Sequence, residues 1–268
     1  MIGPGHRGGF APAKVNLTLH VTGRRADGYH LLDSVVVFAD VGDALTASPG
    51  DGLTVTGPFA EGVPTGDTNL IRRALALAEA PRAITLDKQL PHPGGIGGGS
   101  SDAAAALRLA GVDLPIEALL SLGADLPVCT IARAARMRGI GERVDPLSLP
   151  PLAAVLLHPG LSVPTGEVFR RLKTPDNLSH DAIPDGADYA TLIRWLTAQR
   201  NDLEAPALTF APGIADVLAA LRESGADLAR MSGSGATCFG LYASPARAEA
   251  VAASLARPGW WVVATMLT

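Results

Sequence analysis

The first clear pattern along the chain is a strict alternation of apolar and polar residues over residues 14–21. The apolar positions are Val15, Leu17, Leu19 and Val21. A period of two predicts one half-buried β-strand. Asp27-Gly28 then reads as a hairpin turn, and residues 31–39 predict a second strand. The chain is therefore expected to open as antiparallel β structure.

The remaining pattern alternates short apolar runs with helical periods. Strands are predicted at 43–47, 53–55, 83–87, 153–158, 237–242 and 260–267, and helices at 70–80, after residue 101 as far as Gly111, and at 116–122, 163–172, 189–199, 214–224 and 245–255. Strands followed by helices packed on one side predict an α+β fold.

The residue pattern changes at Leu149-Pro150-Pro151, which predicts a domain boundary there. The two domains would then be residues 1–150 and 151–268. The order of strands and helices in the second half is that of a ferredoxin-like sandwich.

Composition narrows the class of protein. The chain has 268 residues, 47% of them hydrophobic, which is enough for a full core. A net charge of −4 gives no support for a nucleic-acid partner. Cys129 and Cys238 lie far apart without metal-ligand spacing, so reduced thiols are expected. Residues 1–13 lack the pattern of a signal peptide, and no apolar run is long enough for a membrane span. These features predict a soluble cytoplasmic protein, either a monomer or a weak homodimer, with no membrane partner.

The strongest local signal is a glycine-rich loop. Five of the six residues from 94 to 99 are glycine, and Ser100, Ser101 and Asp102 then lead into a run of alanines. A loop of backbone N–H groups that enters a helix N-terminus is typical of a phosphate site, and either serine could cap the helix. No lysine follows the glycines, so this is not a P-loop, and the dinucleotide fingerprint also fails. A plain glycine hinge before an ordinary helix is the alternative.

Two charged residues are candidates for the chemistry. Lysine is rare here, since only Lys14, Lys88 and Lys173 occur among the 22 basic residues. Beside a phosphate site, Asp125 could accept a proton from a substrate hydroxyl, with Lys14 as its charged partner. The alternatives are an exposed charge on a strand edge for Lys14 and a helix cap for Asp125, with Pro127 in the first turn.

Two turns complete the set of candidates. Tyr29 and His30 follow a turn, where their rings could stack on a base; a surface turn with a buried tyrosine is the alternative. Residues 232–235, Ser-Gly-Ser-Gly, form a second glycine turn that could close over phosphates.

Three separated segments resemble the motifs of the GHMP kinases, in the order found in that family. They are residues 11–17, 91–101 and 231–237. The resemblance implies an ATP-dependent small-molecule kinase with an N-terminal half like domain 2 of ribosomal protein S5 and a ferredoxin-like C-terminal half. Residues 23–30, 123–128, 139–142 and 158–160 further resemble a member of this family whose substrate carries a cytidyl group.

The resemblance also implies roles for single residues. Asp125 would be the base and Lys14 its partner, Asn16, Tyr29 and His30 would hold the cytidyl end, and Asn69 and Leu70 would border the adenine. The ATP phosphates would be wrapped by Pro91, Gly94, Gly95, Gly97, Gly98, Gly99, Ser100 and Ser101, with Gly233 and Gly235 closing over them. Mg²⁺ is implied as well; no metal ligand is assigned, although Ser101 is the candidate oxygen.

The chain departs from the family pattern at two positions, and two alternative functions remain open. His92 and Pro93 stand where the family has a more flexible loop, which bears on nucleotide affinity. A GHMP kinase of the homoserine or mevalonate type would not need a base-stacking Tyr29-His30 pair. A non-catalytic nucleotide-binding relative would not need both Lys14 and Asp125.

Overall fold

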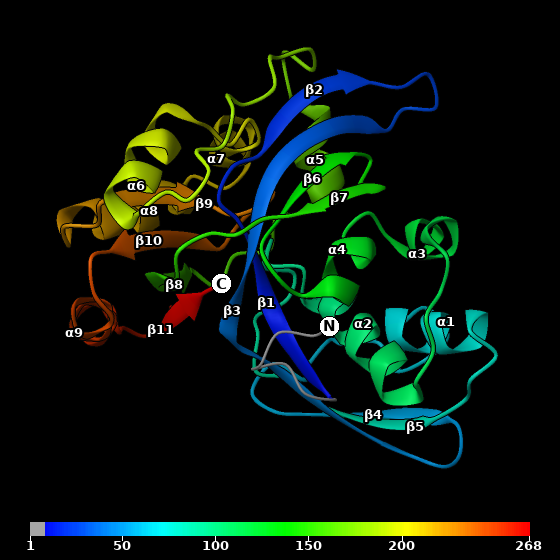
Figure 1. The fold of residues 1–268 in the computed structure, drawn as a ribbon. Coiled ribbons are helices and arrows are strands. Elements are labelled where there is room, and N and C mark those ends of the chain that lie inside the picture. Colours follow the sequence, from blue (N-terminus) through cyan, green and yellow to red (C-terminus); the bar gives the residue numbers. More distant parts are fainter. Residues whose placement is uncertain (1–8) are drawn as a thin grey trace.

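Strand β3 (His30–Ser48) is the element around which the fold is built. The structure is a computed structural model that describes residues 9–268 (Figure 1). β3 pairs along its length with β1 (Phe10–Asn16), β2 (His20–Arg24), β5 (Ala83–Asp87) and β6 (Ala135–Gly139). One sheet runs β4-β5-β3-β11-β8-β10-β9 through the molecule. The predicted α+β class is confirmed.

The N-terminal half packs four helices on one side of β1 and β3 (Figure 1). They are α1 (Leu70–Leu77), α2 (Gly98–Ala110), α3 (Ile116–Leu122) and α4 (Leu126–Ile131). The four alanines 103–106 of α2 are fully buried, and their small side chains let the helix lie close to β1 and β3. β4 (Gly52–Thr56) runs parallel to β5, and β7 (Arg143–Pro146) pairs with β6.

The C-terminal half has the ferredoxin-like topology expected from the sequence. Its strands are β8 (Leu152–His158), β9 (Leu228–Met231), β10 (Cys238–Tyr242) and β11 (Trp261–Leu267), in the antiparallel order β11-β8-β10-β9. Helices α8 (Gly213–Glu223) and α9 (Pro245–Leu255) complete the β-α-β-β-α-β unit. The segment between β8 and α8 adds α5 (Thr165–Arg170), α6 (Tyr189–Ala198) and α7 (Glu204–Phe210).

The two halves share both sheet and core. Leu267 of β11 pairs with Ala39 of β3. Leu19 and Val21, from the N-terminal half, pack in the same hydrophobic cluster as Val155 of β8. The division at 150/151 stays a prediction, and the continuous sheet fixes the halves against each other.

Several local predictions were wrong, each for a physical reason. The expected strand over 14–21 is two strands, because side chains replace regular pairing at Thr18: the Ser34 hydroxyl donates to Thr18 O, and the Thr18 hydroxyl accepts from Val35 N of β3. The segments 31–39 and 43–47 are one strand, β3. Neither Ser100 nor Ser101 caps α2, since the helix begins at Gly98 directly after a left-handed Gly97. Helices α4 and α7 and strands β6, β7 and β9 were not among the predicted elements.

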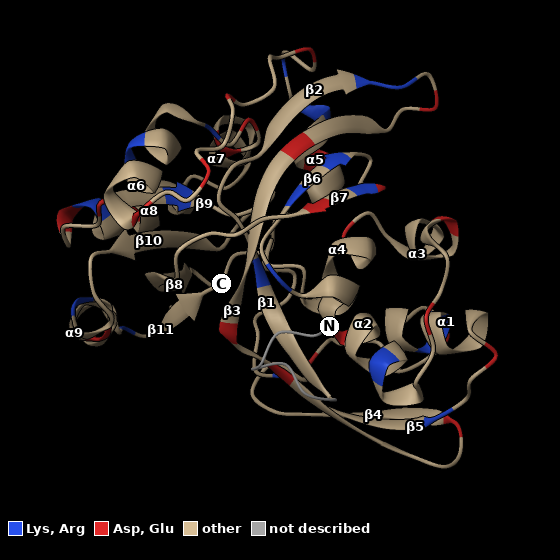
Figure 2. Ribbon diagram, viewed as in Figure 1, with Lys and Arg blue, Asp and Glu red and all other residues tan. Residues whose placement is uncertain are grey.

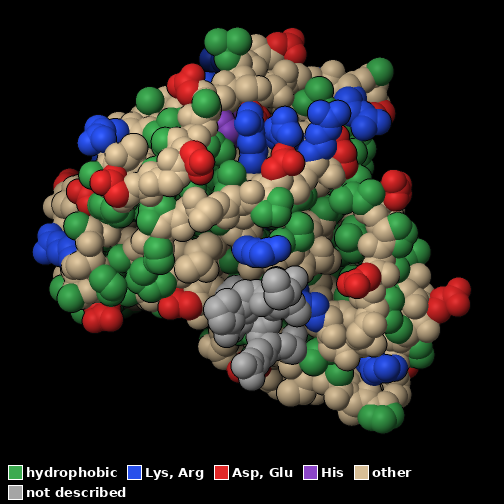
Figure 3. All heavy atoms as spheres, in the orientation of Figure 1, with side chains coloured by type: hydrophobic (Ala, Val, Ile, Leu, Met, Phe, Trp, Pro, Cys, Tyr) green, Lys and Arg blue, Asp and Glu red, His purple; other side chains and the backbone are tan. Residues whose placement is uncertain are grey.

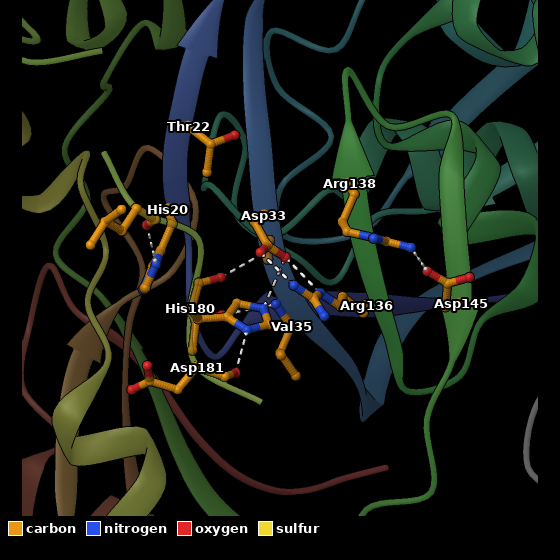
Figure 4. A network of polar contacts seen from close by, with 12 residues as sticks. His20, Thr22, Asp33, Val35, Arg136, Arg138, Asp145, His180 and Asp181 are labelled. Atoms are coloured by element: carbon orange, nitrogen blue, oxygen red, sulfur yellow. Dashed lines mark hydrogen bonds and ion pairs between the residues drawn. The ribbon is translucent and has the colours of Figure 1, made fainter. Parts of the chain in front are cut away.

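Charged residues gather where β3, β6 and β7 lie side by side. β6 carries only basic charged side chains and β7 carries both signs, and the row of basic side chains on this face is broken by acidic ones (Figures 2 and 3). Beneath the surface, Asp33 accepts two hydrogen bonds from the Arg136 guanidinium, at 2.8 and 2.7 Å (Figure 4). His180 Nε2 lies 3.0 Å from Asp33 Oδ1 on its other side. These two partners hold the pKa of Asp33 well below its usual range, against the effect of burial.

We expect Asp33→Asn to lower the free energy of unfolding by about 3–5 kcal/mol, because it removes the anion from a buried ion cluster. Since the native pKa of Asp33 is depressed, its contribution is present above the usual Asp pKa and is lost as pH falls below about 4. Urea titration at several pH values measures this. Asp145→Asn is the control, because Asp145 pairs with Arg138 at the exposed edge of the same sheet and should change stability by less than about 1 kcal/mol. Equal effects for the two variants would contradict the prediction.

Candidate active site

A cavity of about 880 Å³ opens between the two halves of the molecule. Its walls come from β1, the β2–β3 turn, the glycine loop, the start of α4, α5 and the 232–235 turn. The predicted site residues that line it are Lys14, Asn16, Tyr29, His30, Leu70, Gly95, Gly97, Gly98, Gly99, Ser100, Asp125 and Gly233. Residues from both ends of the chain therefore face one space.

Backbone hydrogen bonds join the three segments that carry the family resemblance. Lys14 N donates to Ile96 O at 2.9 Å, and Thr237 N donates to Gly94 O at 3.1 Å. The Ser232 hydroxyl donates to Gly95 O, also at 3.1 Å. The glycine loop is thus held from β1 on one side and from the 232–235 turn on the other.

Two glycines in this loop cannot be replaced without strain. Gly95 has φ +71°, and a Cβ there would lie 2.6 Å from Gly235 O. Gly97 has φ +63°, and a Cβ there would lie 3.1 Å from Lys14 Cβ. This conformation turns the chain directly into α2, which places the helix N-terminus at the cavity. Such a helix start favours an anion.

Lys14 and Asp125 meet at the cavity wall, although 111 positions separate them. Lys14 Nζ lies 2.6 Å from Asp125 Oδ1. The Lys14 side chain is buried, and that of Asp125 is 31% exposed, so the carboxylate is the partner that a ligand can reach. Asp125 stands just before α4, but its side chain makes no capping hydrogen bond. Asp125 thus occupies the N-cap position of α4 without capping it through its side chain, and its carboxylate pairs with Lys14 instead. The exposed-edge alternative for Lys14 is wrong.

The other end of the cavity carries aromatic rings. The His30 ring stacks on Phe169 of α5, with centroids 4.7 Å apart and planes inclined by 23°. Burial, with Arg24 nearby, lowers the pKa of His30 and favours the neutral ring. Tyr29 is 59% exposed, which excludes the buried-tyrosine alternative. No sequence pattern pointed to Phe169, because one aromatic residue on a short helix is normal core composition.

Asn16 is fixed beside the 232–235 turn, where a Cβ on Gly233 would lie 3.5 Å from its side-chain oxygen. Its side-chain nitrogen donates to the Ser34 hydroxyl at 2.8 Å, and its backbone N–H donates to the Ser232 hydroxyl. The carbonyl oxygen of its side chain is buried and has no hydrogen-bond partner among residues 9–268. An acceptor in that state is available to a ligand N–H group.

Other predicted site residues do not line the cavity. Asn69 caps α1 by accepting from Ile71 N at 2.8 Å, and its amide donates to Pro64 O. Pro91, Gly94 and Gly235 are not among the lining residues, though Gly94 and Gly235 shape the loop contacts described above. Ser101 is fully buried and donates to Pro12 O at 2.7 Å, so its expected place beside a metal is corrected. Ser100 lines the cavity instead.

Three further features concern the whole of the described chain. Within residues 9–268, no group of three His, Cys, Asp or Glu side chains is placed to hold a metal ion. None of the helices in this range has both the length and the apolar character needed to cross a membrane. Cys129 and Cys238 are both free and buried.

Comparison with known proteins gives a consistent result. Residues 181–259 match the family described as GHMP kinases C terminal. A 4-diphosphocytidyl-2-C-methyl-D-erythritol kinase of Paracoccus denitrificans is 55% identical, over 98% of this chain and 98% of the relative. A kinase with the same name from Dinoroseobacter shibae is 56% identical, over 98% and 96%.

Solved structures agree with these relatives. A crystal structure of 4-(cytidine 5'-diphospho)-2C-methyl-D-erythritol kinase matches with a TM-score of 0.75 and 38% identity, covering 96% of this chain and 98% of that chain. L. major mevalonate kinase, solved in complex with R-mevalonate, matches with a TM-score of 0.64, covering 98% and 96%. At 15% identity, this second likeness shows the fold alone.

Proposed function

Because the chain belongs to the 4-diphosphocytidyl-2-C-methyl-D-erythritol kinase family of GHMP kinases, we propose that it phosphorylates the 2-hydroxyl of that compound with ATP. This reaction is a step of the non-mevalonate route to isoprenoid precursors. The observation that carries the proposal is the Lys14–Asp125 pair, which lies in the same cavity as a glycine loop and an aromatic slot.

The glycine loop is the site for the ATP phosphates. Its backbone leads into the N-terminus of α2, where N–H groups without helical partners favour negative charge. The loop has no lysine of its own, so backbone dipoles and the nearby Lys14 supply the positive potential. Leu70 lines the cavity beside the loop and borders the adenine. Asn69 acts there indirectly, by fixing the start of α1.

Asp125 is the base of the transfer. Phosphoryl transfer asks the protein mainly for positioning and charge stabilisation. The Asp125 carboxylate accepts the proton of the attacking hydroxyl, while the Lys14 ammonium orients the carboxylate and offsets negative charge on the moving phosphoryl group. The burial of Lys14 strengthens both effects, because less water screens its charge.

The cytidyl end of the substrate fits the slot formed by Tyr29, His30 and Phe169. A base can stack on these rings, while His30 and the free side-chain oxygen of Asn16 offer hydrogen bonds to its edge. A homoserine or mevalonate kinase would have no use for such a slot.

Mg²⁺ and the cellular setting complete the proposal. Mg²⁺ in kinases bridges phosphate oxygens and usually takes only one or two protein carboxylates. Because Asp125 is paired with Lys14, phosphate oxygens of ATP would supply most of the ligands of Mg²⁺. Ser100 is the hydroxyl that we place beside the ion. We further propose that the enzyme acts in the cytoplasm, as a monomer or a weak homodimer.

A coupled assay of ADP release tests the function. The substrates are 4-diphosphocytidyl-2-C-methyl-D-erythritol, mevalonate and homoserine, each with MgATP. Turnover of the cytidyl compound alone is expected. Preferred turnover of either other substrate would replace this proposal, and ATP binding without turnover of any of them would indicate a non-catalytic relative.

Substrate recognition can be tested at the aromatic slot. We expect Tyr29→Ala and Phe169→Ala each to raise KM for the cytidyl substrate by roughly tenfold, because a base–aromatic contact contributes about 1–3 kcal/mol. KM for ATP should stay within about twofold, since the rings lie at the far end of the cavity from the glycine loop. Leu77→Ala is the control, as an exposed apolar residue outside the cavity. Equal increases in KM for the cytidyl substrate and for ATP would mean that the rings stabilise the fold rather than bind the base.

A further inference from the structure

One positive charge in the cavity is left without an acidic partner. The Lys, Arg, Asp and Glu side chains that line the cavity are Lys14, Arg24, Asp27, Asp125 and Arg170. Lys14 and Asp125 pair with each other. Asp27 pairs with Arg25, and Arg170 pairs with Glu167. Within residues 9–268, Arg24 is therefore the lining residue whose charge no carboxylate offsets.

The pairing of β2 with β3 places Arg24 at the aromatic slot. Arg24 lies opposite His30 in the register of the two strands. Its Nε donates to Gly28 O at 3.3 Å, and a Cβ on Gly28 would lie 3.8 Å from its Nη2. The guanidinium thus lies along the turn that presents Tyr29 and His30 to the cavity. The lowered pKa of His30 agrees with this position, since the Arg24 charge contributes to it after burial.

Most donors of the Arg24 guanidinium are free. Only Nε is bound, and neither terminal nitrogen has a hydrogen-bond partner in the part of the chain that the structure describes. Arg230 shows the contrasting structural role, because it is buried and its terminal nitrogens donate to the backbone carbonyls of Leu17, Leu196 and Gln199. A planar guanidinium with free donors at a cavity wall suits the oxygens of a phosphate group.

We propose that Arg24 binds the diphosphate group of the acceptor substrate. The inference rests on the proposed function, which supplies a cytidyl compound that carries this group. A diphosphate is an anion at neutral pH, and in such a compound it joins the ribose directly. When the base stacks between Tyr29, His30 and Phe169, the phosphate oxygens therefore follow within a few bonds, within reach of the Arg24 side chain.

The other groups at this end of the cavity cannot offset the charge of a diphosphate. The aromatic rings and the Asn16 amide are neutral, and the lowered pKa of His30 favours its neutral form. Lys14 is paired with Asp125, beside the hydroxyl that reacts. A bound diphosphate without Arg24 would lose water and gain no partner charge, which is unfavourable. Because this group does not change during the transfer, Arg24 should affect KM for the acceptor rather than kcat.

Binding of cytidine, CMP and CDP to the full-length protein tests the inference, with the nucleotide site filled by saturating MgADP. We expect Arg24→Gln to raise Kd for CDP by about tenfold or more, and Kd for cytidine by less than about twofold, because only CDP offers charged acceptors. Arg24→Lys keeps the charge without the planar set of donors, so its Kd for CDP should lie between these values. Ligand-observed NMR measures all three affinities and needs no turnover.

Arg25→Gln is the matched control. Arg25 is the next residue along the chain and is also exposed, but it pairs with Asp27 and does not line the cavity. Its substitution should leave every Kd within about twofold, since exposed ion pairs contribute little. Equal effects of Arg24→Gln and Arg25→Gln, or equal effects of Arg24→Gln on cytidine and CDP, would overturn the inference.

Kinetics with the complete substrate give an independent measurement. Arg24→Gln should raise KM for the cytidyl substrate by about tenfold, with kcat and KM for ATP nearly unchanged. Added salt should weaken CDP binding more in the unmodified protein than in Arg24→Gln, because it screens the ion pair. If no cytidyl ligand binds the unmodified protein, the substrate assignment is wrong and the inference with it. CDP binding that depends on Arg24, without turnover of the substrate, would overturn the proposed function and support the inference.

Discussion

Asp125→Asn is expected to lower kcat by about 10²–10⁴-fold, the usual contribution of a general base. The amide keeps the size and polarity of the carboxylate but cannot accept the hydroxyl proton. Because Asp125 makes no helix-capping bond and is partly exposed, the fold should survive the change. Single-turnover kinetics with saturating MgATP measures the chemical step, and Kd for ATP should change little.

The melting temperature distinguishes this role from a structural one. If Asp125→Asn keeps a near-normal kcat but melts much lower, the residue stabilises α4 and the proposed mechanism is wrong. Asp113→Asn is a suitable control, since it removes one exposed carboxylate that does not line the cavity and should leave both quantities unchanged.

Lys14→Met is expected to have the second large effect, a fall in kcat of the same order as for Asp125→Asn. Methionine keeps much of the apolar stem that packs beneath Gly97, where a Cβ would come within 3.5 Å of three Lys14 carbons. The variant therefore removes the charge while filling most of the space. Without the ammonium, the carboxylate loses the partner 2.6 Å away that orients it.

The double variant tests whether the two residues act as one unit. Groups that act together give effects far from additive. We therefore expect Lys14→Met/Asp125→Asn to be little slower than the slower single variant. Lys173→Met is the control, because Lys173 is an exposed lysine that does not line the cavity. Fully additive losses would show two independent contributions and would contradict the paired mechanism.

The sequence by itself determined the local features of this protein. The run of glycines from 94 to 99 predicted a loop that leads into a helix, because backbone freedom and helix propensity are properties of the residues themselves. Apolar spacing predicted α3 and α9 with the bounds that the structure has. The order of elements after residue 151 likewise predicted the ferredoxin-like topology, since connections between elements are short and follow few routes.

Predictions from the local sequence pattern were wrong where side-chain hydrogen bonds replaced the regular backbone pairing. Residues 14–21 alternate perfectly, yet the strand breaks at Thr18, because the hydroxyls of Thr18 and Ser34 bind backbone groups there. The short helix α4 and the β6–β7 hairpin carry little periodicity, so only their packing against α2 and β3 defines them.

Only the tertiary structure decided which residues form the site. Lys14 and Asp125 lie 111 positions apart, and the sequence left both with plausible structural alternatives; only the folded chain brings them within 2.6 Å of each other. Phe169 reaches the slot because α5 packs across from the β2–β3 turn. Lys88, which follows β5, lies buried between the carboxylates of Asp43 on β3 and Asp102 on α2 only in the folded chain. The physical reason is that burial and the charges of neighbours distant in sequence are properties of the packed chain. They set the proton affinity of a side chain and decide which groups it can contact.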